Sequence, residues 1–472
     1  MLLRSRRILL ALIPAAVLSL TLAATSSALT LDSTYGQSGT SPGFALPAGS
    51  KWRVVDSVLR TDGSIAILVS NLKHKRFGIY SVTAEGRPDP AFGPRGWRTG
   101  SISASQKGQP DAIAAYPDGR LLVVARRFER HNDVSAVVMR FGRDGKQDFG
   151  FARSRKDTSS VARRIAVKGR RVLPGDLVVD SHDFVIVSYT ADYKRLGAVR
   201  LDREGRPDSG YGRLNQRQLN SADFSTYFGV SPESIALLPD NSVAIGGMVV
   251  TEECDDPELC PAGAWSREEP VVIRLSASGF QLRNFGGSRT RPRGARFVST
   301  DFDGSNLGLS ARPDGSIVVV LDSTYSFRKP GTTDQGEQTF STVFRRLLTN
   351  GQFDLTGVER EENGLHDPVY PTPDSREEEL YRNGYSIAPS GAIAVCGQER
   401  RDILRKGEYD NDHPGFIQVI DATSAADETI SAANFWRTAD PENAIEDCAW
   451  QSEGNLLAVD LNKTLTVSRY HP

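Results

Sequence analysis

The sequence has no excess of charge of either sign. Its 472 residues include 57 Lys or Arg and 58 Asp or Glu, which gives a formal net charge of −1. Proteins that hold a nucleic-acid backbone need a clear basic excess, so we expect no nucleic-acid partner. Hydrophobic residues make up 39% and charged residues 24%, an ordinary balance for a globular protein. This balance excludes a collagen, a coiled coil and a protein with many membrane spans.

Cysteine, histidine and known catalytic motifs are also scarce. Four Cys and six His leave little material for a metal site, and the His are spread along the chain without a close pair. The sequence contains no Gly-x-Ser-x-Gly, His-Glu-x-x-His, P-loop or dinucleotide-binding fingerprint. We therefore expect no metal and no cofactor, and the sequence identifies no catalytic residue.

The N-terminus is typical of a secretory signal peptide. Arg4, Arg6 and Arg7 precede an uncharged apolar stretch over 8–24, and residues 26–28 supply the small side chains of a cleavage site. The prediction is a signal peptide over 1–28 and a periplasmic or secreted mature chain. The stretch also resembles a twin-arginine export signal, so the export route stays open. No later stretch is long and apolar enough to span a bilayer.

One unit of about 60 residues recurs seven times. Each unit places a tight first turn between a run of small residues and a continuous apolar run rich in β-branched residues. Apolar runs without alternation suit strands covered on both faces, and small residues suit strands crowded near a central axis. The first turns lie at 61–63, 117–119, 181–183, 239–241, 313–315, 389–391 and 452–454.

A third strand and a second turn follow, and an Asp-x-x-aromatic-Gly element is predicted to close each unit as its fourth strand. The element is clear at 86–93 and 205–212 and is not recognisable in units five and six. Four strands in each of seven units predict an all-β fold, a seven-bladed β-propeller in one domain over 29–472. Residues 29–36 match only the fourth element, and 445–472 match only the first three strands. The two ends are therefore predicted to share the last blade, with 29–36 paired near Val467.

The unit resembles the delta-60 repeat of secreted bacterial proteins. An apolar-Arg-apolar third strand contains Arg140, Arg200 and Arg274, and residues 31–36 match the closing motif. The resemblance covers almost all of the mature chain and implies this fold and export. It implies no shared activity and no catalytic residues. The recurring Arg is expected to pair with a repeat Asp or to lie on the rim.

The four Cys predict two disulfides in an exported protein. Cys254 and Cys260 enclose an acidic loop, for which a calcium loop and a redox pair are the alternatives. Cys396 and Cys448 stand at similar height above equivalent turns in neighbouring blades. A bond between them would fasten blade six to the closing blade and contribute about 4 kcal/mol in the chain-entropy model.

Long insertions gather on one predicted face of the ring. Residues 251–270, 322–341 and 398–415 interrupt blades four, five and six between their second and third strands, and 357–383 link blades five and six. Structured insertions on one face of a rigid scaffold often carry binding residues. The candidate ligand-binding residues are the aromatic side chains of these insertions: Trp265, Tyr325, Phe327, Tyr370, Tyr381 and Tyr409.

Two kinds of function fit this prediction. The first is a binding or scaffold module, expected to be a monomer, for an extracellular or periplasmic ligand that is a protein or a carbohydrate and that meets the insertion face. The alternative is a propeller-type hydrolase or lyase with its site at the axial mouth. Propellers host both kinds, so the fold does not decide between them. The alternative to a binding role for the six aromatic residues is a structural one, in which they pack the insertions against the ring.

Overall fold

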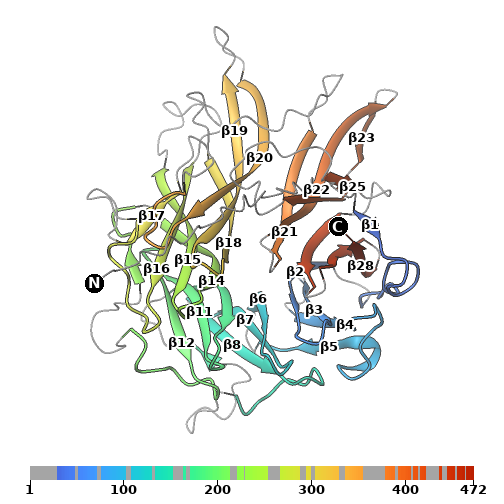
Figure 1. The fold of residues 1–472 in the computed structure, drawn as a ribbon, viewed down its shortest axis with the longest axis horizontal. Helices are drawn as coiled ribbons and strands as arrows, with labels where there is room; N and C mark the ends of the chain where they lie inside the picture. Colours follow the sequence, from blue (N-terminus) through green and yellow to red (C-terminus); the bar gives the residue numbers. More distant parts are fainter. Residues whose placement is uncertain are drawn as a thin grey trace, which may run out of the picture.

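The protein is described from a computed structural model, in which the strands form a ring (Figure 1). The structure describes residues 29–47, 51–71, 76–102, 108–129, 133–151, 163–165, 171–212, 221–227, 229–253, 266–286, 294–298, 303–328, 335–354, 378–388, 392–405, 408–412, 415–420, 435–437, 444–451, 454–462 and 464–471. Within these residues the only helical segment is the single turn η1 (Pro94–Gly96). No helix in the described part of the chain is long and apolar enough to cross a bilayer.

Seven antiparallel sheets, the blades, surround one axis (Figure 1). The inner strands are β2 (Trp52–Leu59), β6 (Gly108–Ala115), β10 (Val172–Val179), β14 (Gly229–Leu237), β18 (Asp303–Ala311), β21 (Glu378–Ile387) and β26 (Ile445–Trp450). The second strands are β3 (Ile65–Asn71), β7 (Leu121–Phe128), β11 (Val185–Ala191), β15 (Val243–Glu253), β19 (Ile317–Arg328), β22 (Ile393–Arg405) and β27 (Leu456–Leu461).

The third strands are β4 (Arg76–Val82), β8 (Val134–Phe141), β12 (Arg195–Leu201), β16 (Ser266–Leu275), β20 (Gln335–Leu347), β24 (Gly415–Ile420) and β28 (Leu465–His471). The outer strands are β5 (Trp97–Gly100), β9 (Arg163–Arg164), β13 (Ser221–Asp223), β17 (Ala295–Phe297), β25 (Phe435–Arg437) and, in blade seven, β1 (Thr30–Leu31). Within the described residues blade five has three strands, and β23 (Glu408–Asp412) pairs with the far end of β22. The predicted seven-bladed β-propeller is thus confirmed.

The hydrophobic core lies between neighbouring blades. The second strands β3 and β11 are buried along their whole length. Leu122 and Val124 of blade two pack in one cluster with Val185 and Val187 of blade three. Each such buried side chain contributes about 1.5–3 kcal/mol. Burial on both faces explains why these strands are apolar without alternation.

The two ends of the chain close the ring together, as predicted. Thr30 and Leu31 of β1 pair with His471 and Tyr470 of β28. The amide of Ser41 then donates to the Val467 carbonyl at 2.7 Å. The shared last blade is confirmed, although the segment beside Val467 is the one around Ser41 and not 29–36.

The Asp-x-x-aromatic-Gly element is a turn, so its prediction as the fourth strand is wrong. In blade one the chain turns after Asp89, and β5 then pairs with β4. The Asp89 carboxylate holds the turn by accepting from the amides of Ala91 and Phe92 at 3.0 and 3.3 Å. The short strand that follows this turn forms the outer edge of the blade.

In blades two, three, four and seven the Arg of the third strand joins its blade to the next, since Arg140, Arg200, Arg274 and Arg469 each donate to a carbonyl of the following blade. Arg200 donates to Asp208 through Nε (2.8 Å) and Nη2 (2.7 Å), and its guanidinium lies 4.7 Å from the centroid of the Tyr211 ring. Its Nη1 donates to the Ala277 carbonyl of the next blade at 3.0 Å. The expected pairing of this Arg with a repeat Asp is confirmed.

Blade five keeps the same pairing. Arg346 bonds Asp354 at 2.8 Å, and the Asp354 amide donates to the Arg346 carbonyl as the amide of Asp208 does to that of Arg200. The Arg–Asp pair of the closing element is therefore kept in unit five, although the sequence there lacks the aromatic residue of the motif.

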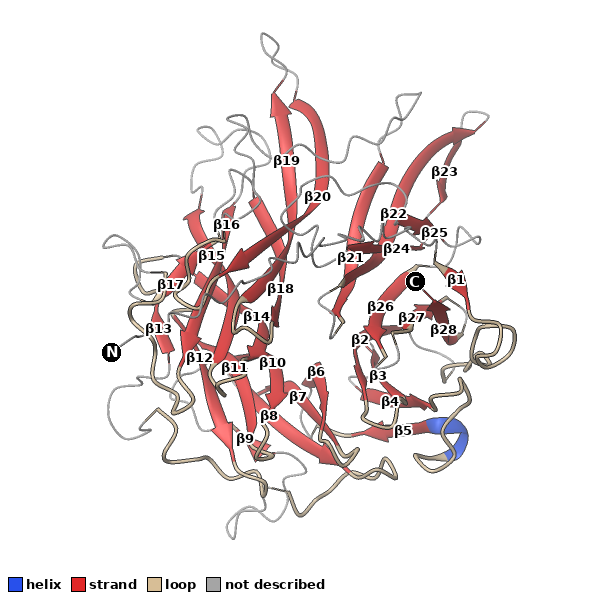
Figure 2. Ribbon diagram, in the orientation of Figure 1, coloured by secondary structure: helices blue, strands red, loops and turns tan. Residues whose placement is uncertain are grey.

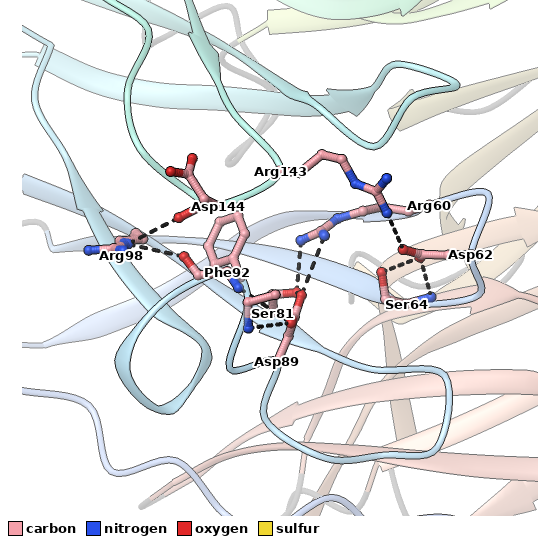
Figure 3. A network of polar contacts seen from close by, with 10 residues as sticks. Arg60, Asp62, Ser64, Ser81, Asp89, Phe92, Arg98, Arg143 and Asp144 are labelled. Carbon is pink, nitrogen blue, oxygen red and sulfur yellow. Dashed lines mark hydrogen bonds and ion pairs between the residues drawn. The ribbon is translucent and has the colours of Figure 1, made fainter.

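Blade one replaces this Arg with Ser81 and recruits an Arg from the end of its inner strand (Figure 3). Nη2 of Arg60 donates to Ser81 Oγ at 2.8 Å, and Nη1 lies 3.5 Å from Asp89 Oδ2. The guanidinium also lies 5.0 Å from the centroid of the Phe92 ring. In blades one and three the turn Asp and its aromatic residue thus meet a guanidinium, whichever strand supplies it.

The disulfide between blades six and seven is confirmed. Cys396 of β22 is bonded to Cys448 of β26, with their Cα atoms 6.2 Å apart. The predicted pair of Cys254 and Cys260 lies outside the described residues.

The insertions of blades five and six contain long strands, where loops were predicted. β19 and β20 stay paired out to Arg328 and Gln335, and β22 pairs with β23 out to Arg405 and Glu408. Figure 2 shows both pairs extending beyond the ends of the strands in blades one to three. The insertions are therefore, in the described part, extensions of the blades themselves.

Candidate functional site

A cavity of about 640 Å³ lies on the axis of the ring, and all seven inner strands contribute to its wall. Six acidic side chains line it: Asp56, Asp111, Asp176, Glu233, Glu446 and Asp447. No Lys, Arg or His is found among the described residues of its lining. Charges of one sign in a cleft with low-dielectric walls focus the field, so the cavity carries a negative potential.

A β-bulge in each inner strand forms the part of the wall that carries these side chains. In blade one, Val54 pairs with Val69 and Asp56 with Leu68, so Val55 is an extra residue. The same irregularity occurs in all seven inner strands. A bulge re-aims the side chains beside it. In three blades a Pro, which cannot donate to the strand ladder, stands just before the bulge: Pro110, Pro174 and Pro232.

The carboxylates lie near the middle of the inner strands. Asp56 is the fifth of the eight residues of β2 and pairs with Leu68, the middle residue of β3. Asp447 is the third of the six residues of β26 and pairs with Val459 of β27. Leu68 of β3 and Cys396 of β22 each lie beside the bulge of their blade. β22 continues for nine residues beyond Cys396, whereas β3 continues for only three residues beyond Leu68. At about 3.3 Å per residue, the strand extension of blade six reaches about 30 Å past the carboxylates.

Three of the carboxylates connect one blade to the next. Oδ2 of Asp56 accepts from the amide of Ile113 in blade two at 2.8 Å. Asp176 of blade three accepts from the amide of Ile235 in blade four at 3.3 Å. Asp447 of blade seven accepts from the Ser57 hydroxyl of blade one at 2.5 Å. These acids therefore hold the ring together as well as line the cavity.

Their burial changes their acidity. Burial raises the pKa of Asp176 and of Asp447 to about 6, although hydrogen bonds to each act in the opposite direction. Burial raises the pKa of Asp56 well above its usual range, and the negative charges of Asp447 and Asp176 raise it further. Carboxyls that repel one another in this way hold protons into the neutral range.

Asp111 is the most deeply buried pair partner in the cavity wall. Its side chain is 7% exposed, and Nε of Arg126 donates to its Oδ1 at 2.8 Å. The second bond from Arg126, through Nη2, goes to the same oxygen. Oδ2 is buried and has no hydrogen-bond partner among the described residues. Burial raises the pKa of Asp111 to about 6, which the charge of Arg126 opposes.

Glu446 stands beside Asp447 at the bulge of blade seven. Burial, together with the smaller effect of the negative charge of Asp447, raises the pKa of Glu446 to about 7. Across the cavity, Glu233 Oε1 accepts from the Ser231 hydroxyl at 2.8 Å. The wall thus includes a carboxyl group that exchanges its proton close to neutral pH.

Blades five and six give the cavity an apolar and aromatic side. Tyr385 of β21 and Leu307 and Leu309 of β18 line it there. The Tyr385 ring can lie over β18 because Gly308 has no side chain: a Cβ there would meet Cε1 of the ring at 2.2 Å. The Tyr385 hydroxyl accepts from the Leu309 amide at 2.9 Å.

The structure places the backbone of four of the six sequence-predicted binding residues. Tyr325 and Phe327 lie on β19, Tyr381 on β21 and Tyr409 on β23, all in the strand extensions. Trp265 and Tyr370 lie outside the described residues. The side chains of all six lie outside the described part of the structure, so their role in binding stays a prediction.

The cavity acids have a signal in the sequence that was missed. Asp56, Asp176 and Asp447 each stand seven residues before the positive-φ residue of the first turn, within the runs that were interpreted only as small. Because the three Asp are equally far from equivalent turns, they lie at the same height in the ring. Among the described residues no three His, Cys, Asp or Glu side chains lie close enough together to hold one metal ion.

No protein-family profile matches the chain, and no curated protein matches it. A PL25 polysaccharide lyase, an ulvan lyase with a bound saccharide, is 9% identical over 92% of this chain and 95% of that chain, with a TM-score of 0.48. An α-L-arabinofuranosidase of Fusarium graminearum is 12% identical over 82% and 98%, with a TM-score of 0.42. A glucose dehydrogenase is 11% identical over 92% and 99%, with a TM-score of 0.37. Such likenesses concern the chain fold and not an activity.

Proposed function

We propose that this protein is an exported binding module of the delta-60 repeat type whose ligand occupies the axial cavity. The observation that carries the proposal is the acidic lining of the cavity, in which six acidic side chains meet no basic group of the described lining, although Arg126 pairs with Asp111 from outside it. A folded protein gains nothing from crowding like charges at one place, and such an arrangement is typical of a functional site. The volume of about 640 Å³ is sufficient for a small molecule or for the end of a longer one.

Export is supported by the N-terminus and by the disulfide. Residues 1–28 have the layout of a cleavable signal peptide. The Cys396–Cys448 bond is of a kind that persists in oxidising compartments. A ligand met there is extracellular or periplasmic.

The strand extensions of blades four to six complete the proposed binding face. They leave the ring on the face that carries the connections between the second and third strands. Tyr325, Phe327, Tyr381 and Tyr409 belong to these extensions and are proposed to contact the part of a protein or carbohydrate ligand that projects from the cavity.

Blocking the cavity tests the proposal. Ser310 lines the cavity from blade five and carries none of its charge, so Ser310→Trp would fill the space and Ser310→Ala would leave it open. Wild type and both variants are screened by ligand-observed NMR against neutral disaccharides, uronic acids, amino sugars, amino acids and polyamines. We expect at least one class to bind wild type and Ser310→Ala and to be lost in Ser310→Trp. Binding unaffected by Ser310→Trp, or no binding of any class, would overturn the proposal.

A hydrolase or lyase at the axial mouth is the second candidate, and one observation favours it. Glu446, with a pKa of about 7 beside Asp447, is a group that can donate a proton near neutral pH. Incubation of any bound saccharide with the protein, followed by product analysis, separates the two functions. Turnover that is lost in Glu446→Gln would establish an enzyme, and binding without turnover would establish the binding module.

A further inference from the structure

We propose that the axial cavity binds a small organic cation that carries amine groups on an apolar chain. This inference rests on the proposed function and names the chemical class of its ligand. Two features of the cavity carry it: the distribution of charge, and the apolar and aromatic side formed by blades five and six.

The charge is distributed around much of the ring. Asp56, Asp111, Asp176, Glu233 and the pair of Glu446 and Asp447 come from five blades, and no basic side chain of the described lining faces them. Arg126 reaches Asp111 from the second strand of blade two and is not part of the lining. A cationic ligand would remove the repulsion between these groups, whereas a neutral ligand would leave it in place.

The opposite side fits the apolar part of such a ligand. Leu307, Leu309 and the ring of Tyr385 line the cavity between blades five and six. An aromatic ring attracts a neighbouring ammonium group, and leucine side chains favour methylene groups over water. A chain with amines at its ends and methylenes between them matches both sides at once.

A bare metal ion fits less well. No three acidic side chains of the described structure lie close enough to ligate one ion. A divalent ion that meets only one or two ligands keeps most of its water and gains little from the site. Widely spaced carboxylates instead suit a ligand whose charges are themselves spaced along a chain.

Calorimetric titration with spermidine tests the inference, with 1,8-octanediol as a neutral chain of comparable length. Spermidine is expected to bind at pH 7.5 with one site and the diol is not. Glu446→Gln is expected to weaken spermidine about tenfold, the loss typical of one charge-assisted contact. Asp118→Asn removes the same charge from an exposed turn, where Asp118 pairs with Arg120, and is expected to change nothing. Ser310→Trp is expected to abolish binding.

Affinity is also expected to rise with pH between 5 and 7.5. Asp111, Asp176 and Asp447, with pKa values of about 6, and Glu446, with a pKa of about 7, lose protons over this range. Asp56 and Glu233 also line the cavity, Arg126 bonds Asp111, and the charge of Arg53 on β2 also acts on Asp111. The cavity therefore becomes more negative as the pH rises, and the ammonium groups stay charged.

Four results would overturn the inference. Equal binding of the diol would show that charge is not recognised, and tighter binding of Ca²⁺ than of spermidine would identify a metal site. Equal spermidine affinity in wild type, Glu446→Gln and Ser310→Trp would place the amine on the outer surface. A neutral or acidic sugar that needs the open cavity, without any spermidine binding, would leave the proposed function standing and remove this ligand class.

Discussion

The hydroxyl of Tyr385 in blade six lies 3.1 Å from the hydroxyl of Ser234 in blade four, across the inner strand of blade five. The ring lies over Gly308, and the hydroxyl also donates to the Leu309 carbonyl at 3.2 Å. One side chain therefore connects three blades at the level of the bulges.

Replacing Gly308 with Ala should disturb this bridge. The new Cβ would lie 2.2 Å from the Tyr385 ring, so the ring or the strand must shift. We expect the free energy of unfolding to fall by about 1–3 kcal/mol, the usual cost of overpacking. In a Tyr385→Ala background the same change should cost much less, because the colliding ring is gone. Urea unfolding of the four proteins measures the coupling, and equal costs in both backgrounds would contradict this account.

The acidic cavity should make stability depend on pH in a particular direction. Glu446 has a folded-state pKa of about 7, raised from 4.5, so the folded state binds the proton more tightly than the unfolded state. Its contribution is fully present below pH 4.5 and is lost as the pH rises through 7. Glu446→Gln should therefore stabilise the ligand-free protein at pH 8 by about 1–3 kcal/mol and should have little effect at pH 4.5 to 5. Chemical unfolding at both pH values checks this, and a stabilisation of equal size at both would refute it.

The closing strand should be sensitive to pH in the opposite direction. Asp32 bonds Arg469 through Nε at 2.6 Å, and hydrogen bonds from Thr34 and Arg469 outweigh burial and lower the Asp32 pKa to about 2. Its contribution is present above pH 4 and is lost as the pH falls through 2. Asp32→Asn should lower the melting temperature at pH 7 and bring it closer to wild type at pH 2.5. Deleting 29–36 should lower it further at pH 7, and an unchanged melt would contradict the shared blade.

The disulfides can be checked directly. Non-reducing peptide mapping should recover Cys396 linked to Cys448, and the sequence also predicts Cys254 linked to Cys260. Reduction should lower stability by about 4 kcal/mol, because the bond closes a 53-residue loop between two blades. A link between Cys254 and Cys448 would contradict the alignment of the blades.

The sequence predicted the ring because its turns repeat at one spacing and its second strands are buried on both faces. The Cys396–Cys448 bond followed from the same spacing, since residues at equal distance from equivalent turns stand at equal height. The fourth strands were misassigned because the conspicuous motif around Asp89 is a turn that Arg and Asp hold, whereas strands such as Ala295–Phe297 are short and share no pattern.

The cavity was not predicted because it depends on the bulges. In a regular strand successive side chains alternate between two faces, so the direction of an Asp could be predicted from its position. An extra residue such as Val55 breaks the alternation and changes which side chains point to the axis. The acids come from five blades that are up to about 400 residues apart in sequence, and only the closed ring brings them together. The insertions drew attention to one face of the ring and not to its centre.

Trimming the extension of blade six separates the two parts of the proposed site. Gln398 and Gly415 are paired across β22 and β24, so a two-residue turn in place of 399–414 would close that hairpin without changing the blade below it. The disulfide at Cys396 and the cavity acids remain. We expect a melting temperature within a few degrees of wild type, unchanged spermidine affinity and weaker binding of any large protein or carbohydrate ligand. The matched control shortens the connection in blade two, where 130–132 join β7 to β8, and should leave both affinities intact. Full retention of large-ligand binding after trimming would show that the extension of blade six does not contribute to it.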